Sequence, residues 1–103
     1  MTIPEGIILP GSEAGKQLGF TGDKFYGWLW KHGKYIYISF IISKEPGKGN
    51  FKQLVNRILE LGYGVKIPTP LGLMKQIVQK WGFKKTREYM EEVDEEVEVW
   101  VKE

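Results

Sequence analysis

The 103-residue sequence contains no cysteine and only one histidine. The absence of cysteine excludes disulfides and thiolate metal ligands, and a single histidine leaves metal chemistry to carboxylates, so we expect no metal site. Long hydrophobic runs are also missing. Residues 1–10 are mostly apolar, but they contain Pro4 and Pro10, lack a basic start and are too short to span a bilayer. We therefore expect a cytoplasmic protein with no membrane segment.

The composition is that of a folded chain. Hydrophobic residues make up 42% and aromatic residues 14% of the sequence, which is enough to bury one core but not two. A charged fraction of 27% with a net charge of +2 does not match the composition of disordered chains. We expect a single domain over residues 1–103.

Charge is distributed unevenly along the chain. Residues 1–90 carry 14 Lys and Arg against 6 Asp and Glu, whereas residues 91–103 carry 1 against 7. A basic body could attract nucleic acid, an anionic protein or a phosphorylated cofactor, although surface lysines more often serve solubility alone. The net charge of +2 is modest for a nucleic-acid-binding protein and argues against that partner.

Glycine and proline recur through residues 1–24, which predicts a loop-rich lead-in to a core over residues 25–103. Ser12 could open a single helical turn, but Gly15 and Gly19 argue against anything longer.

Residues 25–43 are rich in aromatic and β-branched side chains, interrupted only by residues 31–34. Gly33 suits a tight turn there, so the pattern predicts a β-hairpin. The second arm, residues 35–42, is apolar on both faces, which predicts a central strand that is covered on both sides.

Two amphipathic helices are predicted after the hairpin. The first begins with Asn50 as its N-cap and stops near Leu61, because Gly62 can adopt the left-handed conformation that ends helices. The second begins at Thr69-Pro70 and stops at Gly82. Its buried face is expected to comprise Leu73, Met74, Ile77, Val78 and Trp81.

Short strands complete the prediction. Residues 65–67 form one strand between the helices, residues 86–90 form another, and Val97, Val99 and Val101 share one face of a last strand. The acidic residues 91–96 form the turn before it. A strand–helix–strand crossover requires parallel pairing, so we expect an α+β fold with a mixed β-sheet and two amphipathic helices.

The segment with the clearest chemical implication is the glycine-rich loop of residues 44–50, between the long strand and the first helix. Glycines let a backbone approach an anion closely, and the N–H groups and dipole of the following helix favour phosphate. Lys44 and Lys48 could add positive charge. Taken alone, the same pattern also fits an ordinary loop.

Two motifs in register extend this interpretation: Lys44-x-x-Gly47-x-Gly49 in the loop, and Lys80-Trp81-Gly82-Phe83 at the end of the second helix. In these motifs, and in the order of elements over residues 35–103, the chain resembles the GNAT superfamily of acyl-CoA N-acyltransferases, and its brevity is similar to that of small GNAT-like proteins of phage genomes. The resemblance implies an N-terminally abbreviated GNAT-like fold. It also implies binding of acetyl-CoA or another CoA derivative, and an N-acetyltransferase activity.

The resemblance also implies a site. Backbone N–H groups from Gly47 to Phe51 would hold the CoA pyrophosphate, and main-chain groups of residues 41–43 would meet the pantetheine arm. The cofactor-binding residues implied in this way are Ile41, Ile42, Ser43, Lys44, Gly47, Lys48, Gly49, Asn50 and Phe51.

The catalytic residues of the family are not matched. Val78 stands at the position of the family's tyrosine acid, Leu71 stands at that of its asparagine, and residues 35–43 contain no carboxylate. The remaining candidates for acid–base chemistry are Tyr35 and Tyr37.

Two alternatives therefore stay open. The first is a catalytically inactive GNAT-fold module for binding or interaction. The second is a basic nucleic-acid-binding protein that stacks bases on the aromatic hairpin residues Trp28, Trp30, Tyr35 and Tyr37.

Overall fold

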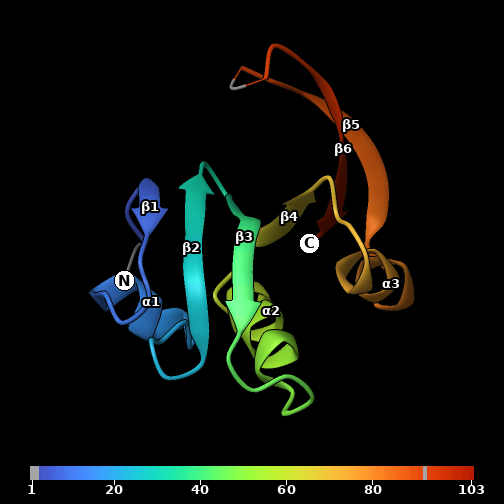
Figure 1. Cartoon of the computed structure of the whole chain (residues 1–103). Coiled ribbons are helices and arrows are strands. Elements are labelled where there is room, and N and C mark those ends of the chain that lie inside the picture. The colour runs from blue at the N-terminus through green and yellow to red at the C-terminus, as the bar shows by residue number, and fades with distance from the viewer. Residues whose placement is uncertain (1–2, 92) are drawn as a thin grey trace.

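Six strands form one mixed sheet with the order β1-β2-β3-β4-β6-β5 (Figure 1). The computed structural model describes residues 3–91 and 93–103. The elements follow one another as β1 (Gly6–Ile8), α1 (Glu13–Leu18), β2 (Phe25–His32), β3 (Tyr35–Ser43), α2 (Asn50–Glu60), β4 (Gly64–Pro68), α3 (Leu73–Lys80), β5 (Lys84–Met90) and β6 (Glu95–Lys102).

Strand pairing confirms the α+β class with a mixed sheet. Strands β1, β2 and β3 pair antiparallel, β4 lies parallel to β3, and β6 pairs antiparallel with both β4 and β5. The last hairpin therefore inserts its second strand beside β4, and β5 forms the outer edge of the sheet.

The helices pack on one face of the sheet, here called the helix face. Ile36 and Ile38 of β3 join Leu54 of α2 and Val78 of α3 in one buried cluster. Side chains alternate between the two faces along a strand. The opposite face carries Trp28, Tyr37 and their neighbours, and we call it the open face. None of the helices among residues 3–91 and 93–103 is long and apolar enough to cross a bilayer.

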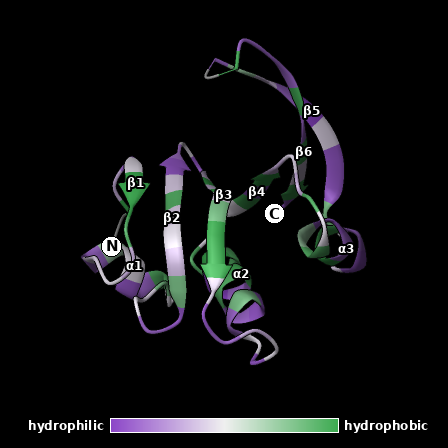
Figure 2. Cartoon of the chain, viewed as in Figure 1, coloured by the Kyte–Doolittle hydropathy of each residue, from purple (hydrophilic) through white to green (hydrophobic). Residues whose placement is uncertain are grey.

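The hairpin of β2 and β3 is confirmed, and β3 has a strand on either side as predicted. The prediction that β3 is covered on both faces is wrong for the second half of the strand. Ile36, Tyr37 and Ile38 are buried, but Phe40 and Ile42, in the half of β3 that does not pair with β4, are 49% and 51% exposed. The hydropathy colouring of Figure 2 shows β3 as a largely hydrophobic strand next to the paler and more polar β2.

The lead-in is more ordered than predicted, since it contains β1 and the six-residue helix α1. The Ser12 hydroxyl accepts a hydrogen bond from the Gly15 N–H (3.1 Å), and α1 ends at Gly19. Gly15 does not break this helix. A Cβ there would lie 2.7 Å from the carbonyl oxygens of Leu9 and Phe20, so glycine is what permits the close packing.

Both helices begin at other residues than predicted. The N-cap of α2 is Gly49, with φ 79°, and not Asn50 as predicted. Asn50 is the first helical residue, and its side chain does not cap the helix. Helix α3 begins at Leu73 and not at Thr69-Pro70, because Thr69 has a φ of 43° and donates its N–H to the Glu98 carbonyl (2.7 Å). This bond turns the chain towards β6 before the helix can start.

The ends of the helices agree with prediction, since Gly62 and Gly82 both have positive φ. The predicted buried face of α3 is only partly buried. Val78 is buried, Met74, Ile77 and Trp81 are half-buried, and Leu73 is 67% exposed. This exposure is explained by a cleft beside the helix.

Gly27 on β2 offers a test of the hairpin geometry. It has a φ of 105°, and an added Cβ would lie 2.2 Å from the backbone oxygen of Phe40. We expect Gly27→Ala to lower the free energy of unfolding by about 2–4 kcal/mol, because it combines strain with overpacking. Gly22→Ala is the matched control, since a Cβ at Gly22 meets nothing within 4 Å. Urea unfolding that shows equal stability for the two variants would contradict this packing.

Candidate functional site

The sheet opens between β3 and β4. Their parallel pairing covers three residue pairs, from Tyr35 opposite Gly64 to Tyr37 opposite Lys66, and β3 then continues to Ser43 without β4 while still paired with β2 (Figure 1). Strand β4 ends at Pro68, which has no N–H to donate. The edge of β3 beyond Tyr37 therefore presents main-chain groups that β4 does not pair.

A cleft of about 480 Å³ lies on the helix face beside this free edge, and we call it the helix-side cleft. Strand β3 and the glycine-rich loop form one wall, and α3 forms the other. Its lining is Phe25, Ile41, Ile42, Ser43, Glu45, Pro46, Gly47, Gly49, Asn50, Phe51, Lys52, Leu73, Met74, Ile77 and Trp81.

The mouth of this cleft is the N-terminus of α2. Gly47 and Gly49 have φ values of 85° and 79°, which turn the loop sharply into the helix. No side chain caps α2, and its first backbone bond runs from the Gln53 N–H to the Gly49 carbonyl (3.0 Å). The preceding N–H groups of the first turn point out of the helix end, where the helix dipole favours an anion.

The structure brings most of the sequence-predicted cofactor residues to this cleft. Seven of them line it: Ile41, Ile42, Ser43, Gly47, Gly49, Asn50 and Phe51.

Lys44 and Lys48 are not part of the lining. The Lys44 ammonium donates to the Gly22 carbonyl and lies 4.2 Å from the centre of the Tyr26 ring. Lys48 lies exposed in the loop. Lys52, which the sequence analysis did not select, supplies a positive charge in the cleft.

The α3 wall was also missed as part of a site. The apolar stripe of the second predicted helix points to this wall, but helical periodicity alone does not distinguish a cleft wall from a core-facing surface. Phe51 and Trp81 stack with ring centres 5.7 Å apart, and both line the cleft, so the stack joins the start of α2 to the end of α3. The apolar stripe of α3 thus contributes Val78 to the core and Met74, Ile77 and Trp81 to the lining of the cleft.

Glu98 on β6 holds α3 in place. Its carboxylate accepts hydrogen bonds from Lys75 of α3 (2.5 Å) and from the Trp100 indole (2.6 Å). The Lys75 ammonium holds the pKa of the Glu98 carboxyl at about 2, below its ordinary 4.5, and the Trp100 hydrogen bond lowers the pKa further.

The two catalytic candidates lie on the paired part of β3. The Tyr35 hydroxyl donates to Glu103, and this hydrogen bond raises the pKa of Tyr35. The Tyr37 hydroxyl donates to Glu88 (3.0 Å), and burial together with that bond raises the pKa of Tyr37. Neither hydroxyl belongs to the lining of the helix-side cleft.

A smaller hollow of about 190 Å³, the connecting gap, lies where β3 and β4 separate. It shares Ile41 and Met74 with the helix-side cleft, so the two hollows adjoin. Ser39, Pro68 and Thr69 form its other side.

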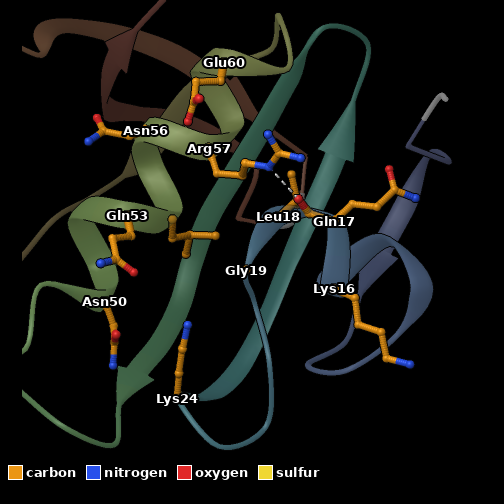
Figure 3. Close-up of a pocket in the computed structure, with 11 residues that line it drawn as sticks. Lys16, Gln17, Leu18, Gly19, Lys24, Asn50, Gln53, Asn56, Arg57 and Glu60 are labelled. Carbon is orange, nitrogen blue, oxygen red and sulfur yellow. Dashed lines mark hydrogen bonds between the residues drawn. The ribbon is translucent and has the colours of Figure 1, made fainter.

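A basic groove of about 490 Å³ runs between α1, the loop of residues 19–24 and α2. Figure 3 shows Lys24 and Arg57 extending into it, while Lys16 turns outward. The Arg57 guanidinium donates to the Gln17 carbonyl (3.0 Å) and so joins α2 to α1. The groove shares Asn50 with the helix-side cleft and places positive charge close to the mouth of that cleft.

Within residues 3–91 and 93–103, no three His, Asp or Glu side chains are grouped to hold a metal ion. Comparison with known proteins gives no match to a family model, to a curated protein or to a solved structure.

The Glu98 contacts predict a pH dependence of stability. Because the pKa of this carboxyl is lower in the folded protein than its ordinary value, its stabilising effect is complete above pH 4.5 and is lost as the pH falls towards 2. We expect Glu98→Gln to melt at a lower temperature than the wild type at pH 7, and this difference to close between pH 4.5 and 2.

Lys75→Met provides the control, because it removes the main donor. The Glu98→Gln effect should be smaller in that background. A difference in melting temperature that stays constant down to pH 2 would show that Glu98 does not hold α3 through its charge.

Proposed function

We propose that this protein binds a CoA thioester, such as acetyl-CoA, in the helix-side cleft and transfers the acyl group to an amine. The observation that carries the proposal is the combination of an apolar cleft with a glycine-rich, uncapped helix N-terminus at its mouth. An anion-binding end joined to an apolar channel suits a ligand with a pyrophosphate and a long flexible arm.

The pyrophosphate and the pantetheine arm of a CoA thioester find matching chemistry. The N–H groups of the first turn of α2 and the Lys52 ammonium are suited to the pyrophosphate. The free edge of β3 at Ile41–Ser43 can pair with the amides of the pantetheine arm, as an added strand would. The nearby basic groove attracts anionic ligands to this end of the molecule.

The GNAT resemblance supports the same ligand. Its loop motif, ending in Gly47 and Gly49, lies at the mouth of the cleft. The second motif, Lys-x-Gly-Phe, ends the helix that forms the far wall of the cleft, and Trp81 at its variable position lines the cleft.

Acyl transfer in this proposal depends on positioning. An amine held against a thioester can react without a dedicated acid, because proximity alone can supply about 7–11 kcal/mol of the barrier. The tyrosine hydroxyls of β3 are held by carboxylates, and their raised pKa values keep them protonated. They are neither free bases nor part of the cleft lining.

The nucleic-acid alternative has less support. The aromatic residues of the hairpin do share the open face, but Tyr37 is buried and Trp30 is half-buried, with their rings 5.2 Å apart. Of the four aromatics considered for stacking, only Trp28 is classed as exposed, at 42%. Base stacking requires accessible ring faces. Of the four predicted residues only Trp28 offers one, although Tyr26 and Phe40 of the same hairpin are also exposed, at 57% and 49%.

CoA binding predicts a thermal shift. A ligand at 100 times its dissociation constant stabilises the folded state by about 2.7 kcal/mol, which for a domain of this size raises the melting temperature by on the order of 10 °C. We expect acetyl-CoA and CoA to give this shift, and ATP to give a smaller one because it lacks the arm. No shift at millimolar CoA would overturn the proposal, and an equal shift with ATP would reduce the site to a phosphate site.

A branched side chain at the mouth should block the ligand. Gly49→Val places a Cβ on a residue with φ 79°, beside the N–H groups that would meet the pyrophosphate. We expect it to weaken CoA binding at least tenfold in calorimetric titration.

Gly62→Val is the matched control, because Gly62 has a φ of 91° at the other end of the same helix and its Cβ also meets nothing within 4 Å. It should cost similar folding stability and leave CoA affinity unchanged. If both variants lose CoA affinity equally, the cause is a general effect on the folding of α2, and the prediction that Gly49 borders the ligand site is wrong.

A further inference from the structure

The basic groove between α1 and α2 meets the helix-side cleft at the first turn of α2. Asn50 lines both hollows. Just before β2, Lys24 lines the groove, and the next residue, Phe25, lines the cleft. A ligand whose pyrophosphate lies at this helix N-terminus therefore has the basic groove beside it.

The groove follows one side of α2. Asn50, Gln53, Leu54 and Arg57 all line it, and their spacing of i, i+3, i+4 and i+7 places them on the same side of the helix. Two helical turns separate Asn50 from Arg57, which is about 10 Å along the helix axis. This length and the groove volume of about 490 Å³ suit a ligand of the size of a nucleotide.

Two cations of the groove, Lys24 and Arg57, form no salt bridge with any described residue. The salt bridges within residues 3–91 and 93–103 use other cations, which are Lys31, His32, Lys66, Lys75, Lys85 and Arg87. Glu60 also lines the groove, but Figure 3 shows it at the end away from Lys24. Asp23 precedes Lys24 in the sequence, and its carboxylate accepts a hydrogen bond from the Thr21 hydroxyl (2.5 Å). The groove therefore keeps positive charge that attracts an anionic ligand.

The groove offers more than charge to a nucleotide. The Arg57 Nε–H donates to the Gln17 carbonyl (3.0 Å), which holds the guanidinium at the groove, and a planar guanidinium can stack on an aromatic base. Asn50, Gln53 and Asn56 add side-chain amides. Asn and Gln amides match the donor and acceptor on the edge of adenine. Groups suited to a phosphate and groups suited to a base thus line the same groove.

We propose that the basic groove binds the 3′-phosphorylated adenosine of CoA, with Lys24 as the residue that recognises the 3′-phosphate. The proposal rests on the proposed binding of a CoA thioester in the helix-side cleft. Figure 3 shows Lys24 at the Asn50 end of the groove, which suits a phosphate on the ribose next to the pyrophosphate. The adenine lies further along α2, towards Arg57. The groove thereby makes the protein selective for thioesters of complete CoA over pantetheine thioesters that lack the nucleotide.

Dephospho-CoA, which differs from CoA in lacking the 3′-phosphate, tests the proposal. A phosphate monoester carries about −1.5 to −2 charges at pH 7, so its loss removes the group that Lys24 would bind. In calorimetric titration at low salt, we expect CoA to bind the wild-type protein at least tenfold more tightly than dephospho-CoA. This preference should shrink at high salt, because ions screen the added contact. Equal affinity for CoA and dephospho-CoA at low salt would overturn the proposal.

A pair of lysine variants tests the assignment of Lys24. Lys24→Met should lower the ratio of CoA to dephospho-CoA affinity at least fivefold, mainly by weakening CoA binding. Lys16→Met is the matched control, since Lys16 belongs to the same groove but turns outward in Figure 3. It makes the same change in net charge and should leave the ratio unchanged. If Lys24→Met weakens both ligands by the same factor, Lys24 acts through general attraction and the assignment is wrong.

The groove proposal and the proposed function fail in different ways. If CoA and dephospho-CoA bind the wild-type protein with the same affinity, CoA binding stands and the role of the groove is wrong. If neither ligand binds, the proposed function itself is wrong, and the role of the groove falls with it.

Discussion

Three residue pairs hold β3 beside β4, and the helix-side cleft and the connecting gap both lie where that pairing stops. Thr69 adopts a left-handed conformation just after β4, and its N–H bonds to Glu98 of β6, so the chain leaves β3. Had β4 run on beside β3, the free edge at Ile41–Ser43 would be closed. The strained residue at the opening is of the kind that functional sites often contain.

The far wall of the helix-side cleft is held by few contacts. Val78 is the buried residue of α3, and the Phe51–Trp81 stack and the Lys75–Glu98 pair supply further anchors. Segments with little buried apolar surface open at low free-energy cost. Local opening of α3 should therefore cost less free energy than opening of β3, which pairs with a strand on either side.

Some carboxylates of the last hairpin pair with cations of neighbouring elements. Glu88 of β5 pairs with Lys66 of β4 (2.6 Å), and Glu98 of β6 pairs with Lys75 of α3 (2.5 Å), whereas Arg87–Glu96 (3.4 Å) joins the two strands of the hairpin. The first two pairs connect the hairpin to β4 and α3. Lys24 in the basic groove and Lys52 in the helix-side cleft place positive charge near the N-terminus of α2.

Local patterns in the sequence determined the β2–β3 hairpin, the ends of α2 and α3 at Gly62 and Gly82, and the position of the glycine-rich loop at a helix N-terminus. These features depend on alternation, helical periodicity and single glycines, all of which act over a few residues. Tertiary structure alone decided that α1 forms around Gly15, because glycine is needed there for contact with the Leu9 and Phe20 carbonyls. It also decided that β4 pairs with β6, that the α3 stripe lines a cleft, and that the sheet opens at Thr69. Each of these depends on contacts between residues far apart in the chain, and no local pattern specifies them.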